Sequence, residues 1–338
     1  MTRLGVFRNC RFLNCIISFI KKLQFPDDTS CIPTAFPATF LFAYSNDLSS
    51  KTVLDTWNEL AGYESSAKTD FANFGTVRFD SKNEMDMEFH TNLKDTTTTI
   101  KNNLPDPKLV LQNPGVGSNV FDVIEKFFSN TEAPVCGSIL FILLKRYPDE
   151  ADTSRLVSLI RSHHAIVHVI TSANPAGGYY PKAMYSVTSK TNGLGPFEPD
   201  SQFWEIIDRL PMFSNPYPVY SRNIQVTGSG TMSLPALYLP KPDQYWICVT
   251  YQDHLPIDSL KSINIRWTNP NDSGYFEIDT NVVDGSEDTE TYASEWNNFG
   301  VSNYNMTLDY DYLGTDAQNL QIRIYSKTPL NNWLPYSD

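Results

Sequence analysis

The chain has 338 residues, of which 41% are hydrophobic and 13% aromatic, so it is globular, can bury sizeable cores and is long enough for two domains. Its formal net charge is −12, of which −9 lies after Asn215, and such an acidic surface argues against nucleic acid as a partner because it repels phosphates. No stretch reaches the roughly 20 apolar residues of a transmembrane span.

The first 32 residues form a basic segment of uncertain role. The first 25 contain five basic residues and no acidic one. An apolar stretch, 12–20, follows the basic start as in a secretory signal, but Lys21 and Lys22 occupy the place of a small-residue cleavage site. A short basic helix, an uncleaved anchor and a start site that misses a leader upstream all remain open.

Residues 33–214 are predicted to form an α/β domain. Three apolar runs, 39–44, 138–144 and 165–171, predict buried strands of a parallel sheet with helices on both faces. A hairpin of 74–80 with 85–90 adds an antiparallel edge. Helices are predicted between these strands, at about 50–62, 93–103, 121–128, 153–161 and 179–189. The pattern is typical of an open, mainly parallel, Rossmann-type sheet.

The five cysteines predict neither a disulfide-dense scaffold nor a zinc site, because none is paired with histidine at metal-ligand spacing. Cys31 precedes the first buried strand and Cys136 precedes the central one. If these strands are parallel neighbours, both sulfurs lie at the same edge of the sheet and a disulfide is possible. Two free buried thiols are the equally favoured alternative. Cys248, in an alternating strand, is predicted to be a core residue.

Residues 215–338 are predicted to form an antiparallel β-sandwich. The boundary falls near Asn215, where residues 213–220 contain two prolines. Beyond it the pattern alternates with a period of two, as in 263–267 and 304–312. Seven or eight short strands at regular spacing are typical of a sandwich. The acidic run 284–290 is interpreted as a solvated loop, with a calcium loop as the weaker alternative.

The order of elements in the first domain, the Gly-rich loop 113–119 before a helix and the apolar run 138–144 resemble a von Willebrand factor A-type (vWA) domain, over about residues 37–210. More narrowly, the phrases FAYSNDLS, VRFDS, TYQDH and WTNPNDSG are similar to an uncharacterised nematode family that joins such a domain to a C-terminal β-rich one. The resemblance implies extracellular adhesion or recognition in host defence, and therefore secretion.

A vWA domain that binds ligand through Mg²⁺ uses a metal-ion-dependent adhesion site, whose loops supply carboxylate and hydroxyl oxygens. In this chain Ala43 occupies the first carboxylate position, Ser45 matches the first hydroxyl, and Asp47 replaces the second. The position of the loop threonine is held by Ser118 or Asn119. The resemblance therefore implies a degenerate site, with Ser45, Asp47 and Ser118 as a weak set of metal ligands.

Two cations, Lys145 and Arg146, follow the central strand where an acid is expected, and they oppose metal binding by charge repulsion. We expect no cofactor; Mg²⁺ or Ca²⁺ is not favoured. The carboxyl edge of the sheet is still predicted to bind a ligand without metal, because open α/β sheets place binding sites there. Its candidate residues are Ser45, Asn46, Asp47, Ser118, Asn119, Lys145 and Arg146, and the two cations are expected to attract an acidic group.

Three functions remain open from the sequence. A non-enzymatic, secreted recognition or adhesion protein with a protein or carbohydrate ligand is favoured. A structural component of the extracellular matrix comes second, and a hydrolase third, because no exposed nucleophile is paired with a base in any local motif. Asn271 and Asn305 begin the triplets Asn-Asp-Ser and Asn-Met-Thr, which are glycosylation acceptors if the chain is secreted.

Overall fold

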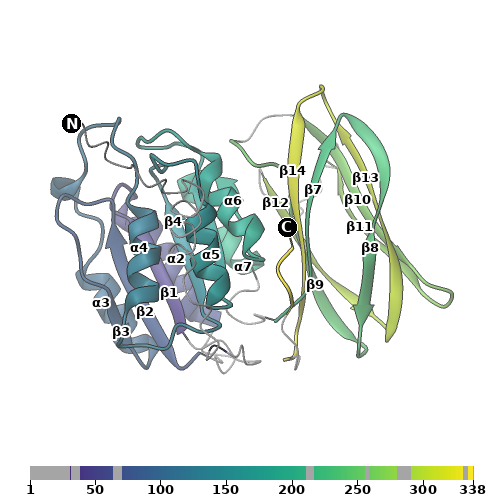
Figure 1. The fold of residues 1–338 in the computed structure, drawn as a ribbon, viewed down its shortest axis with the longest axis horizontal. Helices are drawn as coiled ribbons and strands as arrows, with labels where there is room; N and C mark the ends of the chain where they lie inside the picture. Colours follow the sequence, from purple (N-terminus) through teal and green to yellow (C-terminus); the bar gives the residue numbers. More distant parts are fainter. Residues whose placement is uncertain are drawn as a thin grey trace, which may run out of the picture.

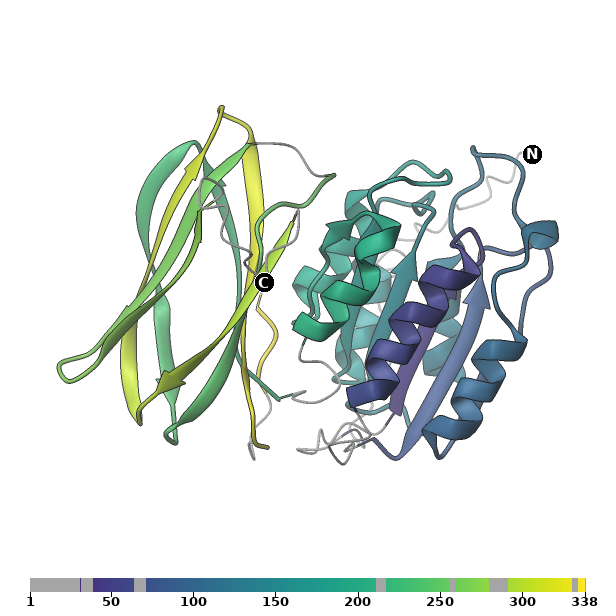
Figure 2. The same cartoon turned by 180° about the vertical axis from the view of Figure 1, so that it is seen from behind.

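The computed structural model describes residues 31, 39–63, 71–210, 217–255, 259–279, 291–329 and 334–337. These residues form an α/β unit followed by an all-β unit that lies against its side (Figures 1 and 2). The basic segment before Cys31, the boundary at Asn215 and the acidic run 284–290 lie outside the described residues. Among the described helices, none combines the length and apolar character needed to cross a bilayer.

The first unit is a six-stranded sheet in the order β3-β2-β1-β4-β5-β6. All neighbouring strands are parallel except β2 and β3, which form the predicted antiparallel edge. Its elements are β1 (Thr39–Ser45), α2 (Ser50–Tyr63), β2 (Asn73–Phe79), β3 (Glu88–His90), α3 (Leu93–Asn102), η1 (Pro107–Leu109), α4 (Val120–Ser129), β4 (Ile139–Leu144), α5 (Ser154–Ser162), β5 (Ile166–Ser172), α6 (Lys182–Lys190), β6 (Phe197–Glu198), η2 (Asp200–Gln202) and α7 (Phe203–Arg209).

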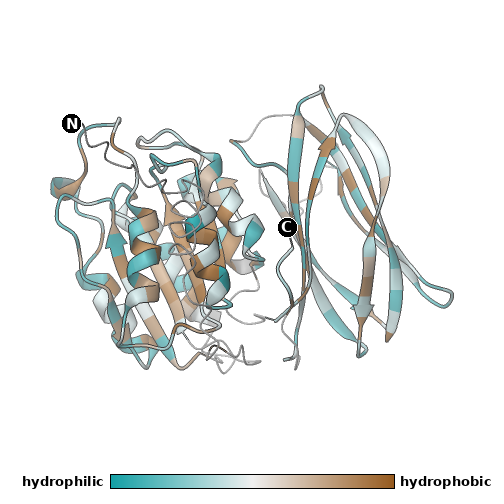
Figure 3. Ribbon diagram, in the orientation of Figure 1, coloured by the Kyte–Doolittle hydropathy of each residue, from teal (hydrophilic) through white to brown (hydrophobic). Residues whose placement is uncertain are grey.

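The central strands are apolar along their whole length because helices cover both faces of the sheet. Every residue of β4 is buried, and its side chains alternate between two cores. Leu140 and Ile142 pack with α4 and α5, whereas Phe141 and Leu143 pack with α2 and α7. Figure 3 shows brown strands at the centre of the first unit, between helices whose ribbons mix teal, white and brown. The predicted fold class, an open, mainly parallel sheet with helices on both faces, is confirmed.

The second unit is an antiparallel β-sandwich, as predicted. Its sheets have the orders β11-β10-β13-β8 and β12-β9-β14-β7. Alternate residues of both sheets fill one core. Its strands are β7 (Tyr217–Thr227), β8 (Ser229–Leu239), β9 (Asp243–Thr250), β10 (Leu260–Thr268), β11 (Ser273–Asp279), β12 (Tyr292–Phe299), β13 (Ser302–Tyr312) and β14 (Ala317–Ser326).

The central strands β9 and β14 of one sheet are largely buried on both faces, because the outer face of this sheet packs against the first unit. Cys248 is fully buried among residues of the first unit's core, in agreement with its predicted core role. Gln321 is also fully buried; its Oε1 accepts a hydrogen bond from Gly195 N (2.9 Å) and its Nε2 donates to Thr188 Oγ1 (2.8 Å). Buried hydrogen bonds therefore join the two domains, and we call this region of contact the seam between the domains.

Candidate functional site

Several loops meet at the carboxyl edge of the first sheet. Strands β1, β4 and β5 are parallel neighbours, so the loops after them emerge on the same side, together with the loop before α4. These loops carry all of the candidate binding residues named from the sequence, from Ser45 to Arg146. The structure therefore brings the predicted site residues to one edge (the carboxyl edge).

Arg146 lies in the centre of the carboxyl edge and is buried together with Asp47. Their side chains are each only 1% exposed, and Arg146 Nε donates a hydrogen bond to Asp47 Oδ2 over 2.7 Å. The remaining nitrogens donate to the main-chain carbonyls of Leu111, Asn113 and Val116, at 3.0, 3.0 and 2.7 Å. The guanidinium thus neutralises the carboxylate and also fixes the shape of the loop before α4.

Lys145 is occupied by an internal partner as well. Its Nζ donates to Asp200 Oδ2 (2.7 Å) and to Ser172 Oγ (3.0 Å), and its side chain is 14% exposed. The sequence had suggested that Lys145 and Arg146 attract an acidic ligand. In the structure both positive charges are instead compensated by acidic side chains of the protein itself.

Asp80, which directly follows β2, is a member of this group that the sequence interpretation missed. It is fully buried; its Oδ2 accepts a hydrogen bond from Ser45 Oγ (2.7 Å) and its Oδ1 accepts from Asn119 N (3.1 Å). Burial raises the pKa of Asp80 to about 7; hydrogen bonds from Ser45 and Ser118 oppose this rise, and the nearby Asp47 carboxylate adds to it. Its position at the end of a strand beside β1 was the available signal.

The other candidate residues hold the loops together. Asn46 joins its loop to Asp106, accepting from Asp106 N (2.9 Å) and donating to Asp106 O (3.2 Å). Ser118 Oγ accepts from Val120 N at the start of α4 (3.1 Å), and Asn119 Oδ1 accepts from Asp80 N (2.9 Å). These polar groups bond to the protein itself, so their observed role is structural.

The weak set of metal ligands, Ser45, Asp47 and Ser118, does not fit a divalent cation. Each side chain already contacts a protein group, and the Arg146 guanidinium stands beside Asp47. Asp47 Oδ1 has no hydrogen-bond partner, but one oxygen is far from the six-ligand shell that Mg²⁺ requires. Among the described residues, His, Cys, Asp and Glu do not gather in groups of three that could bind a metal.

Exposed side chains at the carboxyl edge come from a loop that the sequence interpretation had assigned to a helix. The predicted helix 179–189 begins only at Lys182, and Tyr179 and Tyr180 before it are 64% and 42% exposed. The main-chain nitrogens of both donate to Pro148 O, at 3.3 and 3.1 Å. Val116, 41% exposed, lies in the loop before α4. We call Val116, Tyr179 and Tyr180 the tyrosine patch.

The loops beneath the tyrosine patch are tightly packed. Gly178 has a φ of +84°, and a Cβ there would lie 1.9 Å from Tyr147 O. Its N–H donates to Pro114 O (3.0 Å), and Tyr147 N donates to Gly177 O (2.8 Å). No other residue type fits position 178 without moving the backbone. The tyrosines are therefore presented by a pre-shaped surface.

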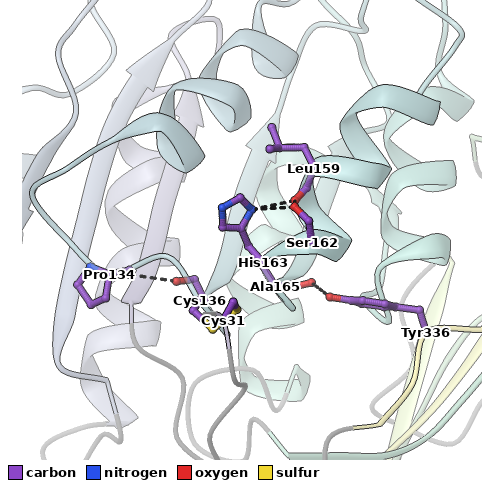
Figure 4. The surroundings of a disulfide bond; sticks show 9 residues. Cys31, Pro134, Cys136, Leu159, Ser162, His163, Ala165 and Tyr336 are labelled. Carbon is purple, nitrogen blue, oxygen red and sulfur yellow. Dashed lines mark hydrogen bonds between the residues drawn. A yellow bond between two sulfur atoms is a disulfide. The ribbon is translucent and has the colours of Figure 1, made fainter. Parts of the chain in front are cut away.

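The opposite, amino edge of the sheet carries a disulfide. Cys31 and Cys136 are bridged across 105 residues, with their Cα atoms 5.4 Å apart. The premise that β1 and β4 are parallel neighbours holds, so the first of the two alternatives left open by the sequence is the one observed. Tyr336 of the C-terminal segment approaches the same edge, where its hydroxyl donates to Ala165 O (2.8 Å; Figure 4).

A family model described as a domain of unknown function (DUF7154) matches residues 222–327, which lie in the sandwich. No match was found among curated protein sequences. Three solved structures with similar folds contain vWA domains. The von Willebrand factor type A protein from Catenulispora acidiphila has 10% identity and a TM-score of 0.35, with 88% of this chain and 59% of that chain covered. This chain thus spans less than two thirds of that protein.

The other two structures cover less of this chain. The SpRpn10 VWA domain has 11% identity and a TM-score of 0.34, with 51% of this chain and 94% of that chain covered. Proximal thread matrix protein 1 from the mussel byssus, described with a zinc-occupied adhesion motif, has 12% identity and a TM-score of 0.33, with 58% and 50% covered. At these TM-scores the similarities assign no ligand, partner or activity.

Proposed function

We propose that the chain is a non-enzymatic recognition protein that acts outside the cell and binds its partner at the carboxyl edge without a metal ion. The observation that supports this most is the buried Arg146–Asp47 pair. The Asp47 carboxylate, which would bind a metal cation, is already paired with the Arg146 guanidinium, a cation that belongs to the same chain.

A guanidinium stays charged at any physiological pH and offers five donors in a fixed plane. Here it bonds to one carboxylate and three carbonyls, which are the kinds of oxygen that a divalent cation would also require. A second cation entering this edge would meet the charge of Arg146 in a dry environment, where repulsion is strong. The site is therefore proposed to be a degenerate adhesion site in which the Arg146 guanidinium holds the loops together in place of a metal ion.

The tyrosine patch is the proposed contact surface. Tyrosine contributes a large, amphipathic area with few rotatable bonds, which is why it is enriched at recognition surfaces. The glycine-containing loops beneath it are fixed by hydrogen bonds, so binding costs little ordering entropy. Because Lys145 and Arg146 are neutralised internally, the partner is proposed to be an uncharged carbohydrate or protein surface.

The proposed extracellular location rests on the Cys31–Cys136 disulfide. Structural disulfides form and persist in oxidising compartments and are rare in the cytosol. This bridge closes a loop of about 100 residues, for which the chain-entropy model gives roughly 4–5 kcal/mol of stabilisation. A reduced form is therefore expected to be much less stable than the oxidised one.

The test uses the labelled full chain on arrays of glycans and of extracellular matrix proteins, in EDTA and in Mg²⁺. We expect saturable binding that is equal in both buffers and is lost in the double variant Tyr179→Ser/Tyr180→Ser. Tyr275→Ser is the matched control, because Tyr275 is equally exposed but lies on the sandwich. Binding that EDTA abolishes, or that survives the double substitution, contradicts the proposal.

The same arrays separate this function from a structural role in the matrix. A matrix component would self-associate with increasing concentration, and it would bind no array member saturably. Self-association is measured by sedimentation of the full chain. Self-association together with no saturable binding on the arrays would contradict the recognition function and support the structural one.

A further inference from the structure

Both Asn-x-Ser/Thr triplets in the sequence fall at one corner of the sandwich. Asn271 lies in the turn between β10 and β11, and Asn305 lies on β13. The strand register places Asn305 beside Thr268 and Thr268 beside Ser273, which is the hydroxyl residue of the first triplet. The two acceptors therefore occupy neighbouring places in the same sheet, on the domain that does not carry the tyrosine patch.

Asn305 points away from the core. Its neighbours Tyr304 and Met306 are buried in the sandwich, whereas Asn305 itself is exposed. Asn271 is exposed in its turn, where its N–H donates to Asn269 Oδ1 (2.8 Å). A bulky hydrophilic group on either side chain would extend into solvent without displacing any core residue.

The strand pairing beside Asn305 is irregular. The pairing of β13 with β8 shifts between Tyr304 and Met306, so Asn305 faces the bulge formed by Pro235 and Ala236. Both of these β8 residues are exposed. The side chains flanking Asn305 on β8 are thus small.

A large exposed aromatic side chain lies next to this bulge. Tyr238 on β8 is 62% exposed and pairs with Asn303. Asn303 is two residues from Asn305 and on the same outer face, so Tyr238 is a diagonal neighbour of Asn305, at about 7–8 Å between the α-carbons. An exposed ring at that distance can cover the first unit of a group attached to Asn305.

We propose that Asn305 and Asn271 carry N-linked glycans and that the first sugar on Asn305 packs against the ring of Tyr238. In the transfer step, the Asn amide nitrogen bonds to C1 of the first sugar of a lipid-pyrophosphate-linked oligosaccharide. The bond from C1 to the pyrophosphate oxygen breaks, the lipid pyrophosphate leaves with the electron pair, and the proton lost by the amide balances its charge. The glycans cover the outer face of β8, β13 and β10 and leave the tyrosine patch free.

The first test is the full chain produced in animal cells. Peptide N-glycosidase converts a glycosylated Asn to Asp, which peptide mass spectrometry reads at Asn271 and Asn305. We expect conversion at both residues in the wild type, no conversion at residue 305 in Thr307→Ala, and retained conversion in Thr307→Ser, which keeps the acceptor hydroxyl. Unconverted Asn305 in wild-type protein from these cells overturns the proposal.

The second test addresses the contact with Tyr238. Enzymatic removal of the glycans is expected to lower the Tm of the wild type by about 2 °C, which corresponds to the loss of a contact of roughly 1 kcal/mol. In Tyr238→Ala the same treatment is expected to change the Tm by much less. Tyr275→Ala is the matched control, because Tyr275 is also exposed but lies two strands from β13, and it is expected to behave as the wild type.

Equal Tm losses in the wild type and in Tyr238→Ala would overturn the packing part of the proposal. These outcomes are independent of the proposed ligand binding. A fully glycosylated chain that binds no array member would contradict the recognition function alone, and a chain that binds but lacks sugar at Asn305 would contradict this inference alone.

Discussion

Two buried arginines hold two different regions of the molecule. Arg146, at the carboxyl edge, bonds to the carboxylate of Asp47 and to three carbonyls. Arg323, in the seam between the domains, is also fully buried, but the hydrogen bonds described for it run to the carbonyls of Ser189, Gly193, Arg222 and Ile322 and to Asn223 Oδ1.

The difference lies in how each charge is compensated. Ser189 is in the last turn of α6, so Arg323 meets the negative end of a helix dipole and several neutral dipoles. Burial lowers the pKa of Arg323 to about 10, which still leaves it charged. Arg146 instead belongs to a pair of opposite charges, and removing one of them leaves the other buried and uncompensated. The number of hydrogen bonds therefore does not predict which arginine matters more for stability.

Arg146→Met is expected to have the largest effect. Asp47 would remain buried without its counter-charge, which typically costs about 3–5 kcal/mol of the free energy of unfolding. Urea denaturation measures it. The double variant Arg146→Met/Asp47→Leu removes both charges and is expected to recover most of the loss. A double variant as unstable as the single one would show that packing, and not charge, explains the effect.

Arg323→Met is expected to cost less, although Arg323 makes more hydrogen bonds. The substitution removes one hydrogen-bond donor from several neutral groups, at a cost of about 1–3 kcal/mol, but Ser189 O keeps the hydrogen bond from Asn223 Nδ2. It also removes a charge that was expensive to bury. Because the lost contacts join the two domains, calorimetry is expected to show a broadened or split transition. A larger loss than in Arg146→Met would show that the number of hydrogen bonds, and not the unpaired charge, decides the cost.

Asp80→Asn tests the carboxyl edge through pH. The pKa of Asp80 is raised from its ordinary 3.8 to about 7 in the folded state, so between these values the folded protein keeps a proton that the unfolded chain has lost. This contribution to stability falls as pH rises through that window, by at most about 1.4 kcal/mol per pH unit. The variant is therefore expected to gain stability relative to the wild type from pH 4 to pH 7, measured by urea denaturation.

The control is the free energy of unfolding of the wild type, measured at the same pH values as that of Asp80→Asn. Other groups, such as the buried His168, titrate equally in both proteins, so the difference between the two curves isolates Asp80. A difference that stays constant from pH 4 to pH 7 would show that Asp80 keeps an ordinary pKa.

Lys51→Ala is expected to have the smallest effect. Lys51 pairs with Asp55 on the surface of α2, where its side chain is 84% exposed. Such a pair contributes about 0.3–0.5 kcal/mol. Denaturation at low and high salt measures it, and a loss comparable to that of Arg146→Met would mean that burial is not what separates the two pairs.

The sequence predicted most strands and helices of the first domain because their apolar runs are long. It missed β6 and α7 in the first domain and β12 in the second. The alternation in β14 correctly predicted a strand, but the same alternation is typical of a sheet with one face in solvent. The burial of Gln321 and Arg323 depends on the neighbouring domain, which no local pattern reveals.

The sequence predicted where the candidate residues lie in the fold, but it did not predict their contacts. The strand order brought Ser45, Asp47, Ser118 and Arg146 to one edge, as expected. The pairing of Arg146 with Asp47 joins residues 99 positions apart, and the role of Asp80 depends on the parallel register of β1 and β2. Both are tertiary contacts between groups whose spacing in the sequence carries no signal.

The most direct test of the central claim, that Arg146 takes the place of an ion at the carboxyl edge, is calorimetric titration of the full chain with MgCl₂ near neutral pH. We predict no stoichiometric binding up to millimolar concentrations and the same Tm in EDTA as in Mg²⁺. Uptake of one Mg²⁺ per chain that is lost in Asp47→Asn would contradict it.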